Sequence, residues 1–113
     1  MSVAATATKQ KTKPAAARPA YQPKPIPRYH VILRDDDDHT YDYVIEMLGK
    51  VFGHGEQKAY LMAKEVDTSG RVIVDTTSLE RAEFKRDQIH GYGSDWRMPR
   101  SKGSMSASIE PAE

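Results

Sequence analysis

The densest group of chemically active side chains in this 113-residue sequence is a run of four aspartates, Asp35 to Asp38. If the run opened a calcium-binding loop at Asp35, Glu46 would fall at position twelve, where such loops have their bidentate ligand. Position six is Thr40, however, and the sharp turn there requires glycine, so the calcium pattern is not met. Adjacent carboxylates repel each other and aspartate favours turns, so we expect an exposed acidic loop. This loop is either merely solvated or a binding site for a cation, and a protein-borne ammonium group is as good a candidate as a metal ion.

The sequence lacks the other common patterns of catalysis and metal binding. It contains no cysteine, which removes thiolate nucleophiles, Cys-ligated zinc and iron–sulfur clusters. None of its histidines has the spacing of a zinc motif such as HExxH, and Gly53-His54-Gly55 lacks the Lys-Ser/Thr ending of a phosphate-binding loop. No nucleophile-elbow motif supports a Ser/His/Asp triad. We therefore expect a protein that is not an enzyme and needs no metal or cofactor.

The acidic loop is predicted to join a strand to a helix. Residues 28–34 have the β-branched and aromatic content of a strand. Thr40 is a suitable N-cap for the next helix, in which Val44 opens an apolar stripe at i, i+3, i+4, i+7 and i+8 that ends at Phe52. Gly53 follows at the position where helices commonly end in the left-handed conformation. The carboxylates therefore lie where a strand ends and an amphipathic helix begins.

The rest of the sequence predicts two more helices and two more strands. A second helix runs from about Glu56 to Glu65, and residues 68–70 (Thr-Ser-Gly) break the chain before a strand at residues 71–76. Thr77 and Glu80 match a capping box, with Thr77 as the N-cap of a third helix. The inward face of that helix is predicted to consist of Leu79, Ala82 and Ile89.

The chain then closes with a loop and a short strand. Residues 94–103 contain Pro, Ser and Gly and predict a loop, and residues 104–110 alternate so that Met105 lies on the inner face of a last strand. The order β-α-α-β-α-β predicts an α+β fold in two layers, with a three-stranded antiparallel sheet packed against three helices.

Basic residues are concentrated at the start of the chain. Seven of the seventeen Lys and Arg residues lie in residues 1–34, and none of the sixteen Asp and Glu residues does. Residues 1–27 are rich in Ala, Lys and Pro and have no apolar periodicity, so we expect a disordered basic extension before one folded domain at residues 28–113. The continuous apolar stretch of a secretory signal is missing. The basic, acid-free composition of residues 1–27 fits an organellar transit peptide only slightly better than it fits a secretory signal.

Composition also bears on partners and location. No apolar run approaches the ~20 residues of a membrane-spanning helix. The formal net charge is +1, and the lysines of the extension are too dilute and too poor in stacking aromatics for a nucleic-acid site. We therefore expect a cytoplasmic protein with neither membrane nor nucleic acid as a partner.

Four segments of the chain, taken together, resemble the Clp protease adaptor family, ClpS. Residues 29–52, with their strand, Asp-rich loop and helix, are similar to the opening of that family, and residues 59–66, 78–85 and 104–112 follow in the family's order. The resemblance covers residues 28–112. It implies an adaptor that binds the N-terminal residue (the N-degron) of a substrate protein, usually Leu, Phe, Tyr or Trp. The adaptor delivers this substrate to the N-terminal domain of a ClpA-type AAA+ unfoldase of the Clp protease, and we expect it to be a monomer.

The resemblance also implies roles for individual residues. The family's ammonium-binding Asn falls on Asp35, the acids after it fall on Asp36 and Asp37, and its ammonium-binding His falls on Asp67. The gatekeeping Met of the family falls on Tyr41. The remaining walls of the pocket for the first side chain fall on Val44, Ala63, Val66 and Met105. The acid and the base that contact the unfoldase fall on Glu80 and Lys85.

Departures from the family pattern leave two functions open. Asp35 and Asp67 stand where the family has Asn and His; two carboxylates can hold an ammonium strongly, but they repel each other without it. Tyr41 replaces a flexible gate by a rigid ring. The alternative is therefore a ClpS-like interaction module that binds the unfoldase but has lost or altered recognition of the N-terminal residue.

Each of these residues also has a simpler interpretation. The pocket residues Val44, Val66 and Met105 can be ordinary core, Glu80 a capping acid, Lys85 a solvated helix residue and Asp67 a cap for the turn after it. Trp96 either plugs the lower edge of the domain or is an exposed contact residue.

Overall fold

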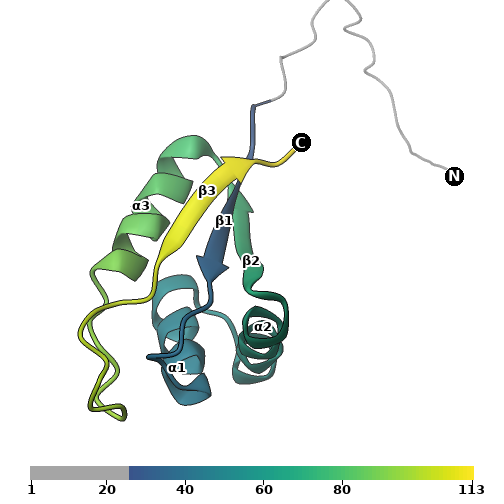
Figure 1. Ribbon diagram of the computed structural model, residues 1–113. Helices are drawn as coiled ribbons and strands as arrows, with labels where there is room; N and C mark the ends of the chain where they lie inside the picture. Colours follow the sequence, from purple (N-terminus) through teal and green to yellow (C-terminus); the bar gives the residue numbers. More distant parts are fainter. Residues whose placement is uncertain (1–25) are drawn as a thin grey trace, which may run out of the picture.

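The central strand of the sheet, β1 (Tyr29–Arg34), comes directly before the acidic loop. The computed structural model describes residues 26–113, so the extension expected at residues 1–27 lies outside the described residues except for Ile26 and Pro27. Figure 1 shows the order β1, α1 (Tyr41–Phe52), α2 (Glu56–Ser69), β2 (Arg71–Thr77), α3 (Leu79–His90) and β3 (Ala107–Pro111). This is the predicted α+β order, with three helices and a three-stranded antiparallel sheet.

The sheet has the strand order β2-β1-β3, and both pairs are antiparallel. The register of β1 against β2 shifts between Val31 and Ile32. Val31 and Leu33 are fully buried in the core, as predicted, but Ile32 between them is also fully buried, so burial does not alternate along this part of β1. Helix α3 lies along β3 and β1, while α1 and α2 pack against each other at the end of the sheet where β1 leads into the acidic loop (Figure 1). The C-terminal end of β1 is therefore surrounded by elements that can form a site.

Helix α1 forms as its sequence predicts. The Thr40 hydroxyl accepts a hydrogen bond from the Tyr43 N–H at 3.1 Å and so caps the helix. Gly53 ends it with a φ of 75°, a left-handed conformation that glycine adopts without steric cost. The apolar stripe is buried from Val44 to Val51. Both ends of α1 are thus specified locally, which fixes the position of the acidic loop before it.

Two predicted helix boundaries were wrong. Helix α2 continues to Ser69 instead of ending at Glu65, because the chain turns only at Gly70, where φ is 85° and the N–H donates to the Val66 carbonyl.

Helix α3 is capped by Ser78, whose hydroxyl accepts from the Arg81 N–H at 3.3 Å, while Thr77 is the last residue of β2. Glu80 therefore does not occupy the position of a capping-box acid. Leu79, at the first helical position, is 41% exposed instead of facing the core.

Two expectations for the last part of the chain also need correction. Strand β3 begins at Ala107, later than the expected residue 104, so Met105 lies just before it, although its side chain is buried. Trp96 is 80% exposed and does not plug the domain. Among residues 26–113, no helix is both long and apolar enough to cross a membrane.

Candidate functional site

Two of the predicted acidic residues lie together where β1 meets the end of α2. The Asp35 N–H donates to the carbonyl of Gly70, which places Asp35 beside the last turn of α2, where Asp67 lies. Partial burial raises the pKa of Asp35; the Asp36 N–H opposes this, and the negative charges of Asp67 and Asp37 raise the pKa further. Such a carboxylate gains from any cation that is brought near it.

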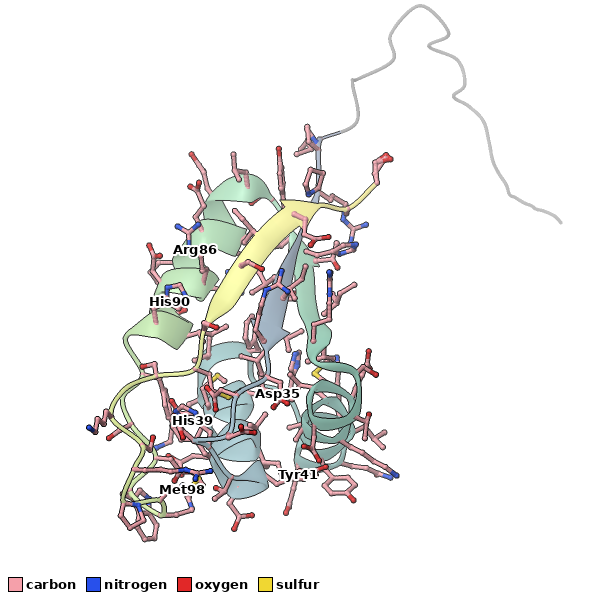
Figure 2. The ribbon with its side chains drawn as sticks, in the orientation of Figure 1. Asp35, His39, Tyr41, Arg86, His90 and Met98 are labelled. Atoms are coloured by element: carbon pink, nitrogen blue, oxygen red, sulfur yellow. The ribbon has the colours of Figure 1, made fainter. Side chains whose placement is uncertain are left out.

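Tyr41 lies directly against this acidic pair. Its hydroxyl donates to a carboxylate oxygen of Asp67 at 2.8 Å, and its ring centroid is 5.8 Å from that of Tyr60 on α2. The hydrogen bond to Asp67 raises the pKa of the Tyr41 hydroxyl, so the group remains a donor. Figure 2 shows Asp35 and Tyr41 on the same side of the molecule, next to α2. Tyr41, the expected gate, is thus hydrogen-bonded to Asp67, one of the acids expected to hold the ligand.

Asp36 has a different environment from the other two acids. Its carboxylate accepts from the Asp38 N–H at 2.9 Å, and the Nδ1 atom of His39 lies 2.8 Å from one of its oxygens. The Nε2 atom of His39 in turn lies 2.7 Å from the Gly103 carbonyl. Asp36 therefore holds the acidic loop in shape and connects it to the loop before β3, while Asp35 and Asp67 form the acidic pair.

The four residues predicted as pocket walls form one buried group. Their side chains are between 1% and 4% exposed and belong to the same apolar core, against which Tyr41 packs: Val44, Ala63, Val66 and Met105. Because these side chains have almost no free surface, a ligand side chain reaches them only if side chains that pack against this core move, and Tyr41 is one of these. The core interpretation and the pocket interpretation therefore describe the same residues, with Tyr41 between them and solvent.

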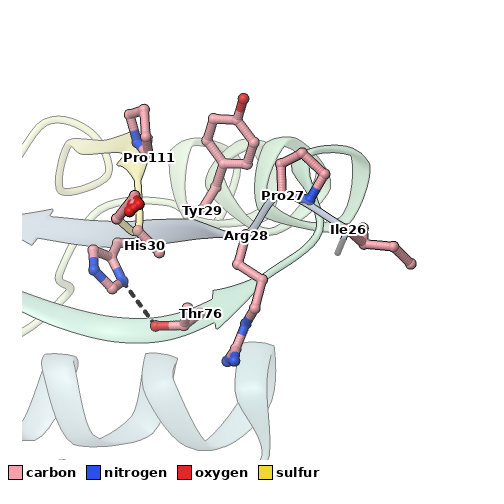
Figure 3. Close-up of a pocket in the computed structure, with 9 residues that line it drawn as sticks. Ile26, Pro27, Arg28, Tyr29, His30, Thr76 and Pro111 are labelled. Carbon is pink, nitrogen blue, oxygen red and sulfur yellow. Dashed lines mark hydrogen bonds between the residues drawn. The ribbon is translucent and has the colours of Figure 1, made fainter. Parts of the chain in front are cut away.

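A separate cavity lies at the other end of β1. Its volume is about 570 Å³, and it is lined where the described chain begins and ends, among others by Tyr29, His30, Thr76 and Pro111 (Figure 3). Inside it, the Nδ1 atom of His30 lies 2.8 Å from the Thr76 hydroxyl. This cavity is apart from the acidic pair. Within residues 26–113, no cluster of three or more His, Asp or Glu side chains is arranged to hold a metal ion.

Asp95 anchors the neighbouring loop, and no sequence pattern pointed to this residue. It is 1% exposed, and its carboxylate accepts from the N–H and the hydroxyl of Thr40 at 2.7 and 2.8 Å. The N–H and guanidinium of Arg97 also donate to it. Burial by itself would raise the pKa of Asp95, but these hydrogen bonds outweigh burial and lower it to about 2. Asp95 thus fastens the loop at residues 94–103 to the cap of α1.

Arg97 connects the loop of residues 94–103 to a second position on α1, Glu46. Its guanidinium donates to Glu46 at 2.8 Å, and the Tyr92 hydroxyl donates to the same carboxylate at 2.6 Å. The hydrogen bonds from Tyr92 and then Arg97 lower the pKa of Glu46. Nothing local in the sequence marks these partners, because they lie about fifty positions apart along the chain.

Comparison with known proteins decides the family. The family model described as "ATP-dependent Clp protease adaptor protein ClpS" matches residues 24–99. The chain belongs to the ClpS family. It is 36% identical over 76 residues to the ClpS adapter protein of Hydrogenovibrio crunogenus, covering 67% of this chain and 73% of that protein. The ClpS adapter protein of Vibrio cholerae O395 is 34% identical over 76 residues, covering 67% of this chain and 72% of its relative.

A solved ClpS structure has the same fold. Agrobacterium tumefaciens ClpS2, whose structure was determined bound to L-phenylalaninamide, superimposes with a TM-score of 0.65 at 22% identity. The match covers 75% of this chain and 96% of ClpS2. The predicted ClpS fold is therefore confirmed, and the protein is an adaptor of the Clp protease.

The two ClpS residues predicted to contact the unfoldase both lie on α3, in different environments. Glu80 is exposed in the first turn. Lys85 is 9% exposed and donates to the Val51 carbonyl at 2.6 Å, with its ammonium 5.6 Å from the ring centroid of Phe52. Lys85 is therefore not the solvated residue that the simpler interpretation predicted. It ties α3 to the end of α1, whereas Glu80 is available on the surface.

Proposed function

We propose that this protein binds the free N-terminus of substrate proteins at Asp35 and Asp67 and delivers them to a ClpA-type AAA+ unfoldase. The observation that supports this most directly is the acidic pair beside Tyr41, in front of an apolar group, within a ClpS fold. The ligand named for Agrobacterium ClpS2, L-phenylalaninamide, has the matching chemistry: a free ammonium and an aromatic side chain.

The ammonium is held by charge and hydrogen bonding together. An ammonium group has three N–H donors, and each carboxylate of the pair offers acceptors, so the hydrogen bonds are charge-assisted. A bound cation also removes the repulsion between Asp35 and Asp67, which lowers the pKa of Asp35 towards its ordinary value. The substitution of Asn and His by two aspartates thus preserves the cation site and gives it more negative charge.

Tyr41 acts as the gate for the first side chain of the substrate. Its hydroxyl and the incoming ammonium compete for Asp67. When the ammonium takes this acceptor, the ring is released and exposes the apolar group behind it: Val44, Ala63, Val66 and Met105. Ligands with both a free ammonium and a bulky apolar side chain are therefore preferred.

The deciding experiment is a calorimetric titration with L-phenylalaninamide and with its N-acetylated form. We expect only the free amine to bind. Asp67→Asn should reduce the affinity on the order of ten- to a hundredfold, the scale of a charge-assisted hydrogen bond. Asp42→Asn is the matched control, because Asp42 is an exposed acid that follows Tyr41 directly. If neither ligand binds, the protein is the alternative interaction module without N-terminal recognition.

Delivery is assigned to different parts of the chain. Exposed Glu80 is the proposed contact on α3 for the unfoldase N-terminal domain, and Lys85 holds that helix in place. The basic extension of residues 1–27 is proposed to be engaged by the unfoldase. Removing residues 1–25 should leave the affinity for L-phenylalaninamide unchanged and slow the degradation of a Phe-initiated substrate. Equal degradation by the full and shortened proteins would refute this role.

A further inference from the structure

Trp96 is an exposed side chain that the proposed function does not use. It is the only tryptophan of the chain and is 80% exposed. A single exposed apolar residue is common on protein surfaces, but this one is held in position. The guanidinium carbon of Arg97 lies 4.6 Å from the centroid of its ring, and Arg97 is itself bound by Glu46 and by buried Asp95. A fixed aromatic ring loses little conformational entropy when it contacts a partner.

The loop that carries Trp96, residues 94–103, is fastened to the acidic loop of the candidate site. Arg100 donates to the Asp37 carbonyl, and its Nε atom lies 3.0 Å from the Asp38 carboxylate. His39 reaches the Gly103 carbonyl, and Asp95 binds Thr40, as described above. The two loops therefore lie side by side, so that the loop carrying Trp96 borders the acidic loop that begins at Asp35.

Charge changes sign along this surface. At one end, Asp35 and Asp67 form the acidic pair. The loop of residues 94–103 contains three basic residues and one acid, and that acid, Asp95, is buried and already bound. Its basic residues Arg100 and Lys102 are exposed; Arg100 is paired with Asp38, whereas Lys102 has no ion pair among the described residues. A polypeptide whose N-terminal ammonium occupies the acidic end can thus place later aromatic and acidic residues against the other end.

We propose that the loop of residues 94–103 is a second contact for the substrate, which binds residues that follow the N-terminal one. An aromatic substrate side chain packs against Trp96, and a substrate carboxylate lies near Arg100 and Lys102. The loop selects among substrates that share the same first residue. This inference rests on the proposed function, since the substrate must first be held at Asp35 and Asp67.

The test compares three ligands: L-phenylalaninamide, a ten-residue peptide of Phe followed by Gly and Ser, and a ten-residue peptide of Phe with Tyr and two Glu among positions four to eight. We expect the third to bind roughly three- to tenfold more tightly than the second, the scale of an aromatic pair. Because Trp96 is the only tryptophan, its fluorescence should change with the third ligand and not with L-phenylalaninamide.

Trp96→Ala should remove the advantage of the third peptide and leave the affinity for L-phenylalaninamide unchanged. Phe84→Ala is the matched control, because Phe84 is an aromatic residue 57% exposed on α3. If the second and third peptides bind equally to the unchanged protein, or if Trp96→Ala weakens only delivery to the unfoldase, the loop is not a substrate contact. If L-phenylalaninamide itself does not bind, the proposed function fails, and this inference fails with it.

Discussion

The hydroxyl of Tyr41 occupies an acceptor of Asp67 that the proposed substrate ammonium would also use. At 2.8 Å from Asp67, it satisfies part of the negative charge of the acidic pair before any ligand arrives. The chain thus contains its own donor at the position where the family pattern has only an apolar gate. The affinity of the site for N-termini depends on how easily this donor is displaced.

Tyr41→Phe should therefore raise the affinity for L-phenylalaninamide by a few-fold. The phenyl ring still packs against the apolar core, but the ammonium no longer competes with a hydroxyl for Asp67. Calorimetry on Tyr41→Phe and on the control Tyr60→Phe, whose ring neighbours that of Tyr41, tests this. An unchanged or lower affinity for Tyr41→Phe contradicts the competition.

The acidic pair should give binding a characteristic pH dependence. Only the ionised carboxylates bind an ammonium well, and the pKa of Asp35 is raised, so affinity should fall as the pH is lowered through that raised value. On the alkaline side, affinity should fall as the terminal amine of the ligand deprotonates near pH ~8. Titrations from pH 4 to pH 9 with Asp35→Asn as comparison measure both limbs. If the acid limb is the same in Asp35→Asn, Asp35 does not control it.

Among the elements, the loop of residues 94–103 is anchored at its start by one buried carboxylate. Asp95 binds the cap of α1 on one side and Arg97 on the other. The loop has no helix or strand of its own, so these hydrogen bonds take the place of regular secondary structure. Loss of the Asp95 charge should loosen the loop and the start of α1 together.

Asp95 should stabilise the fold in a pH-dependent way. Its pKa falls from an ordinary 3.8 to about 2, so its ionised form is favoured by folding, and this contributes about 2 kcal/mol. That contribution is complete above about pH 4 and is lost as the pH falls towards 2. Urea unfolding of Asp95→Asn should show a large loss at pH 7 and a small one at pH 2. Exposed Asp87→Asn serves as control, and equal losses at both pH values would show that the charge of Asp95 is not responsible.

The sequence predicted the features that residues close together in the chain determine, and it missed those that depend on contacts between distant residues. The stripe from Val44 to Phe52 and its caps all lie within fifteen residues, so α1 was predicted correctly at both ends. The start of α3 was misplaced by one residue because Thr77 and Ser78 are both good N-caps, and the pairing of Thr77 in β2 decides between them. The site followed the same rule. The family resemblance at the predicted ends of the first strand and the second helix pointed to Asp35 and Asp67 as site candidates, which they remain, but the Tyr41–Asp67 bond joins residues 26 positions apart.

For the molecule as a whole, β1 connects the two ends of the proposed mechanism. The candidate site follows the last residue of this strand, and the extension proposed to engage the unfoldase precedes the first. The cavity lined by Tyr29 and Pro111 lies at the N-terminal end of β1, away from the acidic pair. The start of the described chain and the acidic pair are therefore separated by the full length of β1.

The central place of β1 also has a mechanical consequence. A pulling force applied before Tyr29 acts along a strand that is hydrogen-bonded on both sides, so it loads the β1–β2 and β1–β3 ladders in shear, with many hydrogen bonds resisting at once. A force applied after Pro111 acts on β3, which is paired on one side only. In an optical trap whose second handle is attached to α2, at the opposite end of the sheet, extraction from the N-terminal end should need a distinctly higher force than extraction from the C-terminal end, and equal forces would contradict this. An unfoldase that pulls on the N-terminal extension would therefore load this domain at β1, where it resists unfolding more strongly than at β3.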